Sequence, residues 1–312
     1  MSKYRNNLPQ LRDKLFVTDG GLETTLVFHE ELALPLFAAF DLLKDEQGID
    51  TLRSYYERYA TIARQRGMGF ILEAPTWRAS RDWAEQLGYD AVTLADANRK
   101  AIGLMLEVRE TYETSASPMV ISGNLGPRGD GYVADTKMSV TQARDYHKQQ
   151  IETFAQTDAD MVSVLTLNYI EEAMGIALAA RDNNMPVAIS FTVETDGLLP
   201  SGDTLAEAIQ KTDEATDAYP VYYMINCAHP THFEHVLNDA SGWRERIHGV
   251  RANASKRSHA ELDESTELDD GNPRELGNHY QQLRQILPNL NVLGGCCGTD
   301  HRHVEAICSA VA

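Results

Sequence analysis

Lysine and arginine are scarce in this chain of 312 residues, which has 28 of them against 46 aspartates and glutamates. The formal net charge at pH 7 is therefore −18. A protein that binds nucleic acid uses lysine and arginine to displace counterions from phosphates. The charge thus argues against a nucleic-acid partner. It agrees with a cationic substrate but does not require one, because many soluble proteins are acidic for solubility alone.

Long apolar runs are also missing. Residues 1–16 hold no apolar core of the length that a signal peptide has. No segment approaches the ~18 consecutive apolar residues that cross a bilayer. Apolar residues still make up 43% of the chain, which is ample for a buried core. We therefore expect a cytoplasmic protein without a membrane partner, in a compartment where thiols stay reduced.

Cysteine occurs only four times, as Cys227, Cys296, Cys297 and Cys308. In a long cytosolic chain, so few cysteines suggest metal binding or catalysis more than a disulfide framework. Cys296 and Cys297 are poorly placed to bridge each other, because disulfide geometry is strained between neighbouring residues. We expect Cys308, which lies beside Ile307 in a helical pattern, to pack in the core.

Short β-rich runs alternate with longer helical runs along the chain. The β-rich runs are close to continuously apolar, as are strands buried on both faces of a parallel sheet. They cover residues 15–19, 70–74, 119–123, 161–165, 187–191, 221–226, 248–252 and 291–295. Apolar residues at helical spacing fall within residues 90–113, 140–157, 170–180, 204–215 and 301–310. This α/β pattern predicts a single (β/α)8 TIM barrel over residues 1–312.

An open, doubly wound sheet is the rival fold for such an alternation. A dinucleotide site in that fold needs GxGxxG after the first strand. The turn here reads TDGGLETTL over residues 18–26 and lacks the third glycine. The barrel is therefore the better prediction.

Three cysteines follow predicted strands directly. Cys227 comes after the strand 221–226, and Cys296 and Cys297 come after the strand 291–295. The carboxyl ends of barrel strands share one face, where active sites are built. Each cysteine taken alone could also be a small buried apolar residue.

Thiolates are soft ligands that select zinc over magnesium or calcium. Three protein ligands leave one tetrahedral position open, as catalytic zinc sites require. A substrate thiol in that position loses its proton near neutral pH, although a free thiol has a pKa of ~8.5. We therefore predict a catalytic zinc site at Cys227, Cys296 and Cys297.

Several segments, in the expected order, resemble the homocysteine S-methyltransferase family. The resemblance covers most of the chain and rests above all on INCAHP and GGCCGTDHRHVEAI. It implies a (β/α)8 barrel, zinc on three cysteines, and transfer of a methyl group to homocysteine to give methionine. Family donors are a sulfonium (S-methylmethionine or S-adenosylmethionine), betaine or a methylated folate, and this chain looks most like the shorter, sulfonium-using members. The segments are residues 18–26, 123–130, 146–154, 158–165, 189–209, 225–230 and 294–307.

The resemblance also implies residues that bind substrate. Asp19 resembles the family aspartate near the substrate amine, and Gly20 and Gly21 permit close approach of the backbone. Asn226 precedes the first cysteine and is expected to orient a ligand or the substrate. Asp19 has an alternative role as the cap of the following helix.

Two positions depart from the family. The family has Glu-Thr at the end of the fourth strand, where the glutamate helps to hold the homocysteine amino group, but here the pair is Leu165-Thr166. Glu73 stands near the end of the second strand, where the family usually has threonine or a similar small polar residue. One hypothesis is that Glu73 supplies the charge that Leu165 has lost. The other is that the pocket is rebuilt for a different thiol or selenol acceptor.

Other functions remain open at this stage. A zinc-binding homologue without catalysis is one alternative. A barrel hydrolase is weaker, because it needs an HxH motif or similar on the first strand, and LFVTD has none. The expected partners are a small thiol acceptor and a methyl donor. The oligomeric state is open, with a homo-oligomer among the options.

Three further features have two interpretations each. The acidic segment 259–273 is a solvated loop or a lid over the active site. Trp77 lies against a cationic donor or packs in the core. Thr299 is expected to cap the last helix, with Asp300 in its first turn.

Overall fold

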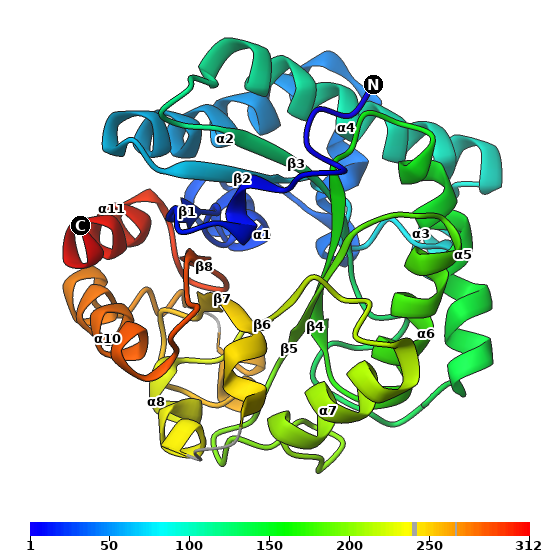
Figure 1. The fold of residues 1–312 in the computed structure, drawn as a ribbon. Helices are drawn as coiled ribbons and strands as arrows, with labels where there is room; N and C mark the ends of the chain where they lie inside the picture. The colour runs from blue at the N-terminus through cyan, green and yellow to red at the C-terminus, as the bar shows by residue number, and fades with distance from the viewer. Residues whose placement is uncertain (239–241, 266) are drawn as a thin grey trace.

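Eight strands lie in chain order and close into a barrel in which neighbouring strands are parallel (Figure 1). The structure is a computed structural model, and it describes every residue except 239–241, 266 and the side chain of residue 263. The predicted (β/α)8 barrel is confirmed, and the open sheet is wrong. The strands are β1 Phe16–Val17, β2 Gly69–Glu73, β3 Met119–Leu125, β4 Met161–Leu167, β5 Val187–Phe191, β6 Tyr222–Asn226, β7 Ile247–Ala252 and β8 Val292–Gly295.

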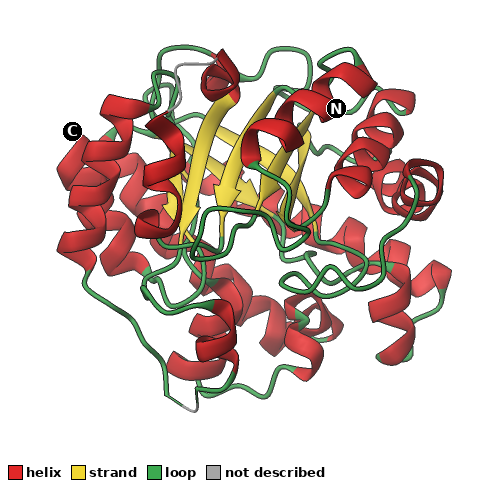
Figure 2. Cartoon of the chain, turned by 90° about the horizontal axis from the view of Figure 1, so that it is seen from below, coloured by secondary structure: helices red, strands yellow, loops and turns green. Residues whose placement is uncertain are grey.

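Helices surround the strands on the outside (Figure 2). All five helices that the periodicity predicts are present. The sequence analysis missed the long helices α2 and α10 and the shorter helices α1, α3, α8 and α9. The helices are α1 Leu22–Thr24, α2 Glu46–Arg66, α3 Arg81–Gln86, α4 Ala91–Tyr112, α5 Val140–Ala155, α6 Ile170–Asp182, α7 Leu205–Thr216, α8 Pro230–Phe233, α9 His259–Asp263, α10 Pro273–Ile286 and α11 His301–Val311. Shorter 3₁₀ or π turns occupy Pro9–Leu11, Thr25–His29, Pro35–Phe37, Ala39–Lys44, Glu234–Asn238 and Gly242–Arg246.

Local capping fixes where several helices begin. Ser139 and Gln142 form a capping box at the start of α5, and Thr204 and Glu207 form another at the start of α7. Each box satisfies two backbone N–H groups that the helix leaves free. These starts set the lengths of the loops between the strands and helices.

The barrel interior has an apolar layer below a polar one. Side chains alternate between the two faces of a strand, so residues two apart both point inward. The apolar layer is made by Phe16, Ile71, Val120, Met161, Ala188, Tyr222 and Val292. Two residues further along their strands stand Glu73, Ser122, Ser163 and Ser190, all buried. The polar layer thus lies toward the carboxyl ends of the strands.

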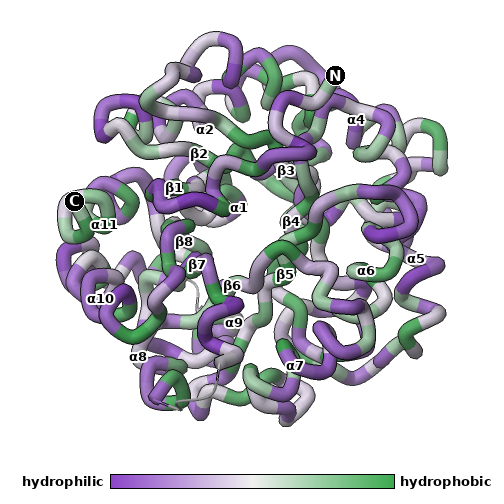
Figure 3. The backbone as a smooth tube through the Cα atoms, in the orientation of Figure 1, coloured by the Kyte–Doolittle hydropathy of each residue, from purple (hydrophilic) through white to green (hydrophobic). Residues whose placement is uncertain are grey.

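The hydropathy of the chain follows this layout. Hydrophobic residues colour strands such as β3 and β5, and hydrophilic residues gather on the outer turns and loops (Figure 3). Among the helices of the described residues, none is both long enough and apolar enough to cross a membrane.

Candidate metal centre

Three cysteine sulfurs meet at the carboxyl end of the barrel. Cys227 follows β6, and Cys296 and Cys297 follow β8. Their three Sγ atoms all lie within 4.8 Å of one another. The Sγ atoms of Cys227 and Cys297 are 3.9 Å apart. Zn–S bonds of ~2.3 Å in a tetrahedral site hold two sulfurs about 3.8 Å apart, so this spacing fits a zinc ion.

The sulfurs of Cys227 and Cys296 are close enough to be bonded as a disulfide, with Cα atoms 5.3 Å apart, while Cys297 is a free thiol. The sequence analysis favoured metal binding over disulfides and did not foresee this pairing. Two cysteines that reach one metal ion also reach each other, which explains why both arrangements suit these positions. Metal binding by all three thiolates requires the reduced pair. Cys308 is buried in α11, as expected.

Cys227 has an unusual backbone conformation. Its φ of 54° lies in the left-handed region, and Thr166 on β4 has a φ of 65°. Such conformations cost about 1–3 kcal/mol in residues other than glycine and cluster at functional sites. Bonds on both sides hold Cys227, because its N–H donates to Arg251 O (3.1 Å) and its carbonyl accepts from Asn253 Nδ2 (3.0 Å).

Asn226 connects three strand ends beside the sulfurs. Its Oδ1 accepts from the Thr166 N–H (2.8 Å) and from Ser190 Oγ (2.6 Å). Its Nδ2 donates to Thr166 Oγ1 (2.8 Å) and lies 3.8 Å from Cys296 Sγ. Thr166 Oγ1 is 3.9 Å from Cys227 Sγ. Asn226 and Thr166 therefore brace the cysteine cluster from below.

The two glycines after β1 let two loops pack closely. The Gly21 N–H donates to Thr299 O at 3.0 Å. A Cβ atom at Gly21 would lie 2.6 Å from Cys296 O, and one at Gly20 would lie 2.9 Å from Thr299 O. Any larger residue at either position would push the cysteine loop away.

Asp19 is buried and paired with Arg251. Its Oδ1 accepts from Arg251 Nη2 at 2.7 Å, and its Oδ2 accepts from Tyr55 Oη at 3.0 Å. Gly21, rather than Asp19, occupies the N-cap position of α1, so Asp19 does not cap that helix. Arg251 also donates to Gly295 O at 3.2 Å, which ties the pair to the strand that carries two of the cysteines.

Glu73 points into the polar layer without a partner. It is 2% exposed, and neither carboxylate oxygen has a hydrogen bond within the described residues. The nearby hydroxyls of Ser122 and Ser163 bond to each other (2.8 Å). Burial raises the pKa of Glu73 to about 7, against the opposing effects of the Arg251 charge and of these two hydroxyls. Leu165 packs in the inner apolar cluster, so no charge stands at that position of β4.

Two residues outside the sequence-predicted set reach the cysteines. Tyr132, in the loop after β3, has its hydroxyl 3.7 Å from Cys297 Sγ. Its ring lies against the His259 ring, with centroids 4.2 Å apart. His259 Nε2 is 2.5 Å from Cys227 O, and Nδ1 is 3.3 Å from Glu194 Oε1. The acidic segment therefore begins with a short helix, α9, whose first residue contacts the site.

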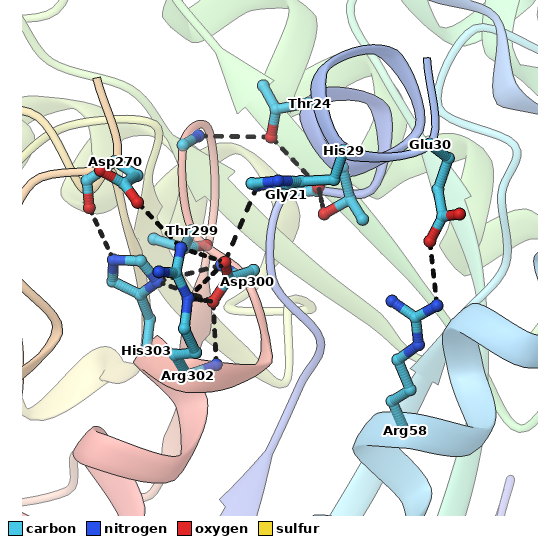
Figure 4. A network of polar contacts seen from close by, with 12 residues as sticks. Gly21, Thr24, His29, Glu30, Arg58, Asp270, Thr299, Asp300, Arg302 and His303 are labelled. Atoms are coloured by element: carbon cyan, nitrogen blue, oxygen red, sulfur yellow. Dashed lines mark hydrogen bonds and ion pairs between the residues drawn. The ribbon is translucent and has the colours of Figure 1, made fainter. Parts of the chain in front are cut away.

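A polar network braces the cysteine loop from the outside (Figure 4). Asp300 caps α11 by accepting from the Arg302 N–H (2.9 Å), whereas Thr299 Oγ1 donates to Cys296 O (2.7 Å). The prediction that Thr299 is the cap is therefore wrong, because its hydroxyl serves the cysteine loop. Burial favours a higher pKa for Asp300, but bonds from His303 and Arg302 hold that pKa below its ordinary value.

The same network joins other loops to the cysteine loop. Arg302 Nη2 donates to Asp270 Oδ2 at 2.8 Å, and His29 Nε2 lies 3.8 Å from Asp300 Oδ2 (Figure 4). Asp270 belongs to the acidic segment, and His29 belongs to the loop after β1. Both loops are thereby held beside the candidate metal centre.

Comparison with known proteins decides the family. A family model described as homocysteine S-methyltransferase matches residues 16–311. The chain belongs to the homocysteine S-methyltransferase family. The match spans all eight strands and the three clustered cysteines, so the resemblance inferred from the motifs is confirmed.

Relatives of this family member are distant but cover most of its length. Homocysteine S-methyltransferase 2 of Arabidopsis thaliana is 23% identical, over 93% of this chain and 91% of the relative. Selenocysteine Se-methyltransferase of Brassica oleracea var. italica is 22% identical, over 93% and 87%. Both relatives are named as methyltransferases.

Solved structures of the Escherichia coli homocysteine methyltransferase MmuM share the fold. Its oxidized form is 20% identical, with a TM-score of 0.76 and 97% coverage of both chains. Its metallated form is 19% identical, with a TM-score of 0.73 and 96% coverage of both chains.

Proposed function

We propose that this protein is a zinc-dependent S-methyltransferase that moves a methyl group from a sulfonium donor to homocysteine, giving methionine. The main observation behind this proposal is that three cysteine sulfurs lie within 4.8 Å of one another at the mouth of the barrel. Cys227, Cys296 and Cys297 would hold the zinc ion. Family membership and the metallated form of MmuM support the proposal.

The chemistry needs few other groups. Zinc, when bound, acts as a Lewis acid that lowers the pKa of the acceptor thiol. The acceptor sulfur then attacks the methyl carbon of the donor and forms a new S–CH₃ bond. The old S–CH₃ bond breaks, and its electron pair stays on a neutral thioether that leaves. No general base acts during transfer and no acid is needed for the leaving group, so the protein's main task is to align the two reactants.

The charges around the mouth favour a cationic donor. The charge of Asp19 acts on Glu23 and on Glu73, and the charge of Arg251 acts on all three carboxylates. Three thiolates around one Zn²⁺ add a net charge of −1. The site is therefore anionic when its carboxylates are ionised, which suits a sulfonium and agrees with the acidic chain as a whole.

Recognition of the acceptor amine is assigned to Asp19 and Glu73. Glu73 is the buried carboxylate without a hydrogen-bond partner in the described part of the chain, and an ammonium group would satisfy it. Thr166 and Asn226 complete the wall beside the sulfurs, and Gly20 and Gly21 leave room for the backbone to approach the substrate.

The deciding experiment is an assay of reduced, zinc-loaded protein with homocysteine. S-methylmethionine, S-adenosylmethionine and betaine serve in parallel as donors, and zinc content is measured. We expect methionine from a sulfonium donor, and loss of both activity and zinc in Cys297→Ala. Cys308→Ala is the matched control, because Cys308 is a buried cysteine of α11 outside the cluster. Full activity in Cys297→Ala would refute the metal site.

A second candidate acceptor is a selenol or another thiol. Two observations favour keeping it: Leu165 has replaced the family carboxylate, and one relative is named selenocysteine Se-methyltransferase. Selenocysteine in the same assay distinguishes the two acceptors. Zinc binding without methyl transfer to any acceptor would instead indicate a zinc protein without catalysis.

A further inference from the structure

Arg78 is held beneath the surface by two aromatic rings. Its guanidinium carbon lies 4.1 Å from the centroid of the Trp77 ring and 3.6 Å from that of Trp83. The side chain is only 9% exposed. Trp77 is fixed in turn, because its indole N–H donates to Leu165 O at 3.3 Å. Trp77 thus contacts an arginine of the protein itself, and the guanidinium has a set orientation.

The hydrogen-bonding capacity of Arg78 is largely unused. Among the described residues its one hydrogen bond runs from Nη1 to Gly129 O, at 3.3 Å. Nε is buried and has no partner in the described part of the chain. No carboxylate of a described residue lies within ion-pair distance of it. An arginine presents N–H donors in a fork that matches the two oxygens of a carboxylate, and here neither Nε nor Nη2 makes a hydrogen bond among the described residues.

Arg78 lies against the loop that carries Tyr132, because its Nη1 donates to Gly129 O. Burial lowers its pKa to about 10 against the opposing charges of Asp130, Tyr132 and Glu23, so it stays cationic at neutral pH. Tyr132 lies 3.7 Å from Cys297 Sγ, and the charge of Glu23 also acts on Cys297. Tyr132 and Glu23 therefore connect Arg78 to the cysteine cluster.

We propose that Arg78 binds the carboxylate of a substrate held beside the cysteine cluster. A buried cation without an ion pair is costly, and a substrate carboxylate on Nε and Nη2 would reduce that cost through two charge-assisted hydrogen bonds. Asp19 and Glu73, to which the amine is assigned above, would take the ammonium group of the same amino acid. The assignment rests on the proposed function, since it takes the ligand to be an amino-acid acceptor or donor.

The test compares substrates with and without a carboxylate. Homocysteine and its decarboxylated analogue 3-aminopropane-1-thiol are titrated by calorimetry into the zinc-loaded protein, without donor. We expect Arg78→Gln to weaken homocysteine binding about 10- to 100-fold, the range for lost hydrogen bonds to a charged group. Binding of 3-aminopropane-1-thiol should change less than about threefold, because it has no carboxylate to lose.

A second arm separates acceptor from donor. The KM for S-methylmethionine and for its decarboxylated analogue, (3-aminopropyl)dimethylsulfonium, is measured with 3-aminopropane-1-thiol as acceptor. If Arg78→Gln raises only the KM of S-methylmethionine and leaves homocysteine binding intact, the donor carboxylate is the ligand. An effect on homocysteine alone assigns the acceptor.

Two further variants distinguish a specific loss of carboxylate binding from a general folding defect. Arg78→Lys keeps the charge but not the fork, so we expect it to recover part of the discrimination. Arg81→Gln is the control, because Arg81 is an exposed arginine three residues along that pairs with Asp82. Equal losses for both members of each substrate pair would overturn the assignment. Absence of all thiol and sulfonium binding in the wild-type protein would refute the proposed function instead.

Discussion

Glu73 is a carboxylate held inside the barrel, 2% exposed and without a hydrogen bond among the described residues. The neighbouring serine hydroxyls bond to each other, and the charge of Arg251 is already paired with Asp19. Single residues of this kind cost stability, and selection retains them where they bind a ligand. At the residue scale, the surroundings of Glu73 therefore support the hypothesis that Glu73 supplies the charge that is missing at Leu165.

Replacing Glu73 by glutamine should harm binding while improving stability. Without the carboxylate, we expect homocysteine affinity to fall about 10-fold or more, since a hydrogen bond to a charged group is lost. Binding of 4-mercaptobutanoic acid, which lacks the amine, should not change. Normal homocysteine affinity in Glu73→Gln would favour a pocket rebuilt for another acceptor.

The stability effect depends on pH with a defined sign. Burial raises the folded-state pKa of Glu73 from 4.5 to about 7. Between these values the folded state binds more protons than the unfolded state, so this group destabilises the fold increasingly as pH rises from 4.5 to about 7. Glu73→Gln should gain up to about 3 kcal/mol at pH 8 and nearly nothing at pH 4. Thermal unfolding at the two pH values measures the difference.

At the scale of elements, the loops after β3, β7 and β8 meet over the cysteines. The loop after β3 supplies Tyr132, and α9 supplies His259, whose ring lies against the tyrosine. The acidic segment is therefore more than a solvated loop, because its first turn contacts Cys227 O and its later part, at Asp270, contacts Arg302. Both contacts place parts of the segment beside the site, and its role as a lid stays a prediction.

Removal of the Tyr132 hydroxyl should weaken metal binding. A hydrogen bond to a ligating sulfur orients it, and loss of such an outer partner costs roughly 10- to 100-fold in metal affinity. We expect Tyr132→Phe to lower zinc affinity about 10-fold in competition with a chelator. Tyr4→Phe is the control, since the Tyr4 hydroxyl bonds Glu113 far from the cysteines in sequence. Equal affinities for the two variants would contradict a role for the hydroxyl.

At the scale of the whole molecule, the barrel and the metal centre are separable. Strands and helices from the whole length of the chain contribute residues to the core. The three sulfurs lie only at the ends of strands. The protein should therefore fold without metal, unlike small zinc domains that are unfolded without it. The pairing of Cys227 with Cys296 further implies that metal loading requires reduced cysteines.

Metal removal tests this separation. After chelation under reducing conditions, we expect the far-ultraviolet circular dichroism to persist and methyl transfer to stop. Saturating zinc should then stabilise the fold by about 4 kcal/mol at a free concentration 1,000 times Kd. Oxidised protein should take up no zinc until a reductant is added. Collapse of the dichroism on chelation would show that the metal holds the fold together.

Most of the architecture could be predicted from local sequence signals. The alternation of apolar strands with helical repeats predicts the barrel, because burial on both faces leaves a continuous apolar run. The helix α2 was missed although Asp45 caps its start and Gly67, with a φ of 62°, ends it. Its many polar residues weaken the apolar periodicity, so the pattern does not stand out.

Some residues of the candidate site could be predicted from the sequence, and others could not. Cys227, Cys296 and Cys297 could be found in the sequence because they follow strands whose ends share one face. Arg78, Tyr132 and His259 could not, since no spacing along the chain relates them to the cysteines. Glu73 was found only as a departure from the family pattern, and its lack of a partner is visible only in the structure.

The sequence alone determined the barrel, the anionic character of the chain and the family, because strand periodicity, charge and motifs are properties of short segments. Tertiary structure decided which residues share the mouth of the barrel: that Asp19 pairs with Arg251 rather than capping a helix, and that Asp300 rather than Thr299 caps α11. Such choices depend on contacts between loops far apart in the chain, and only closure of the barrel brings those loops within hydrogen-bonding distance.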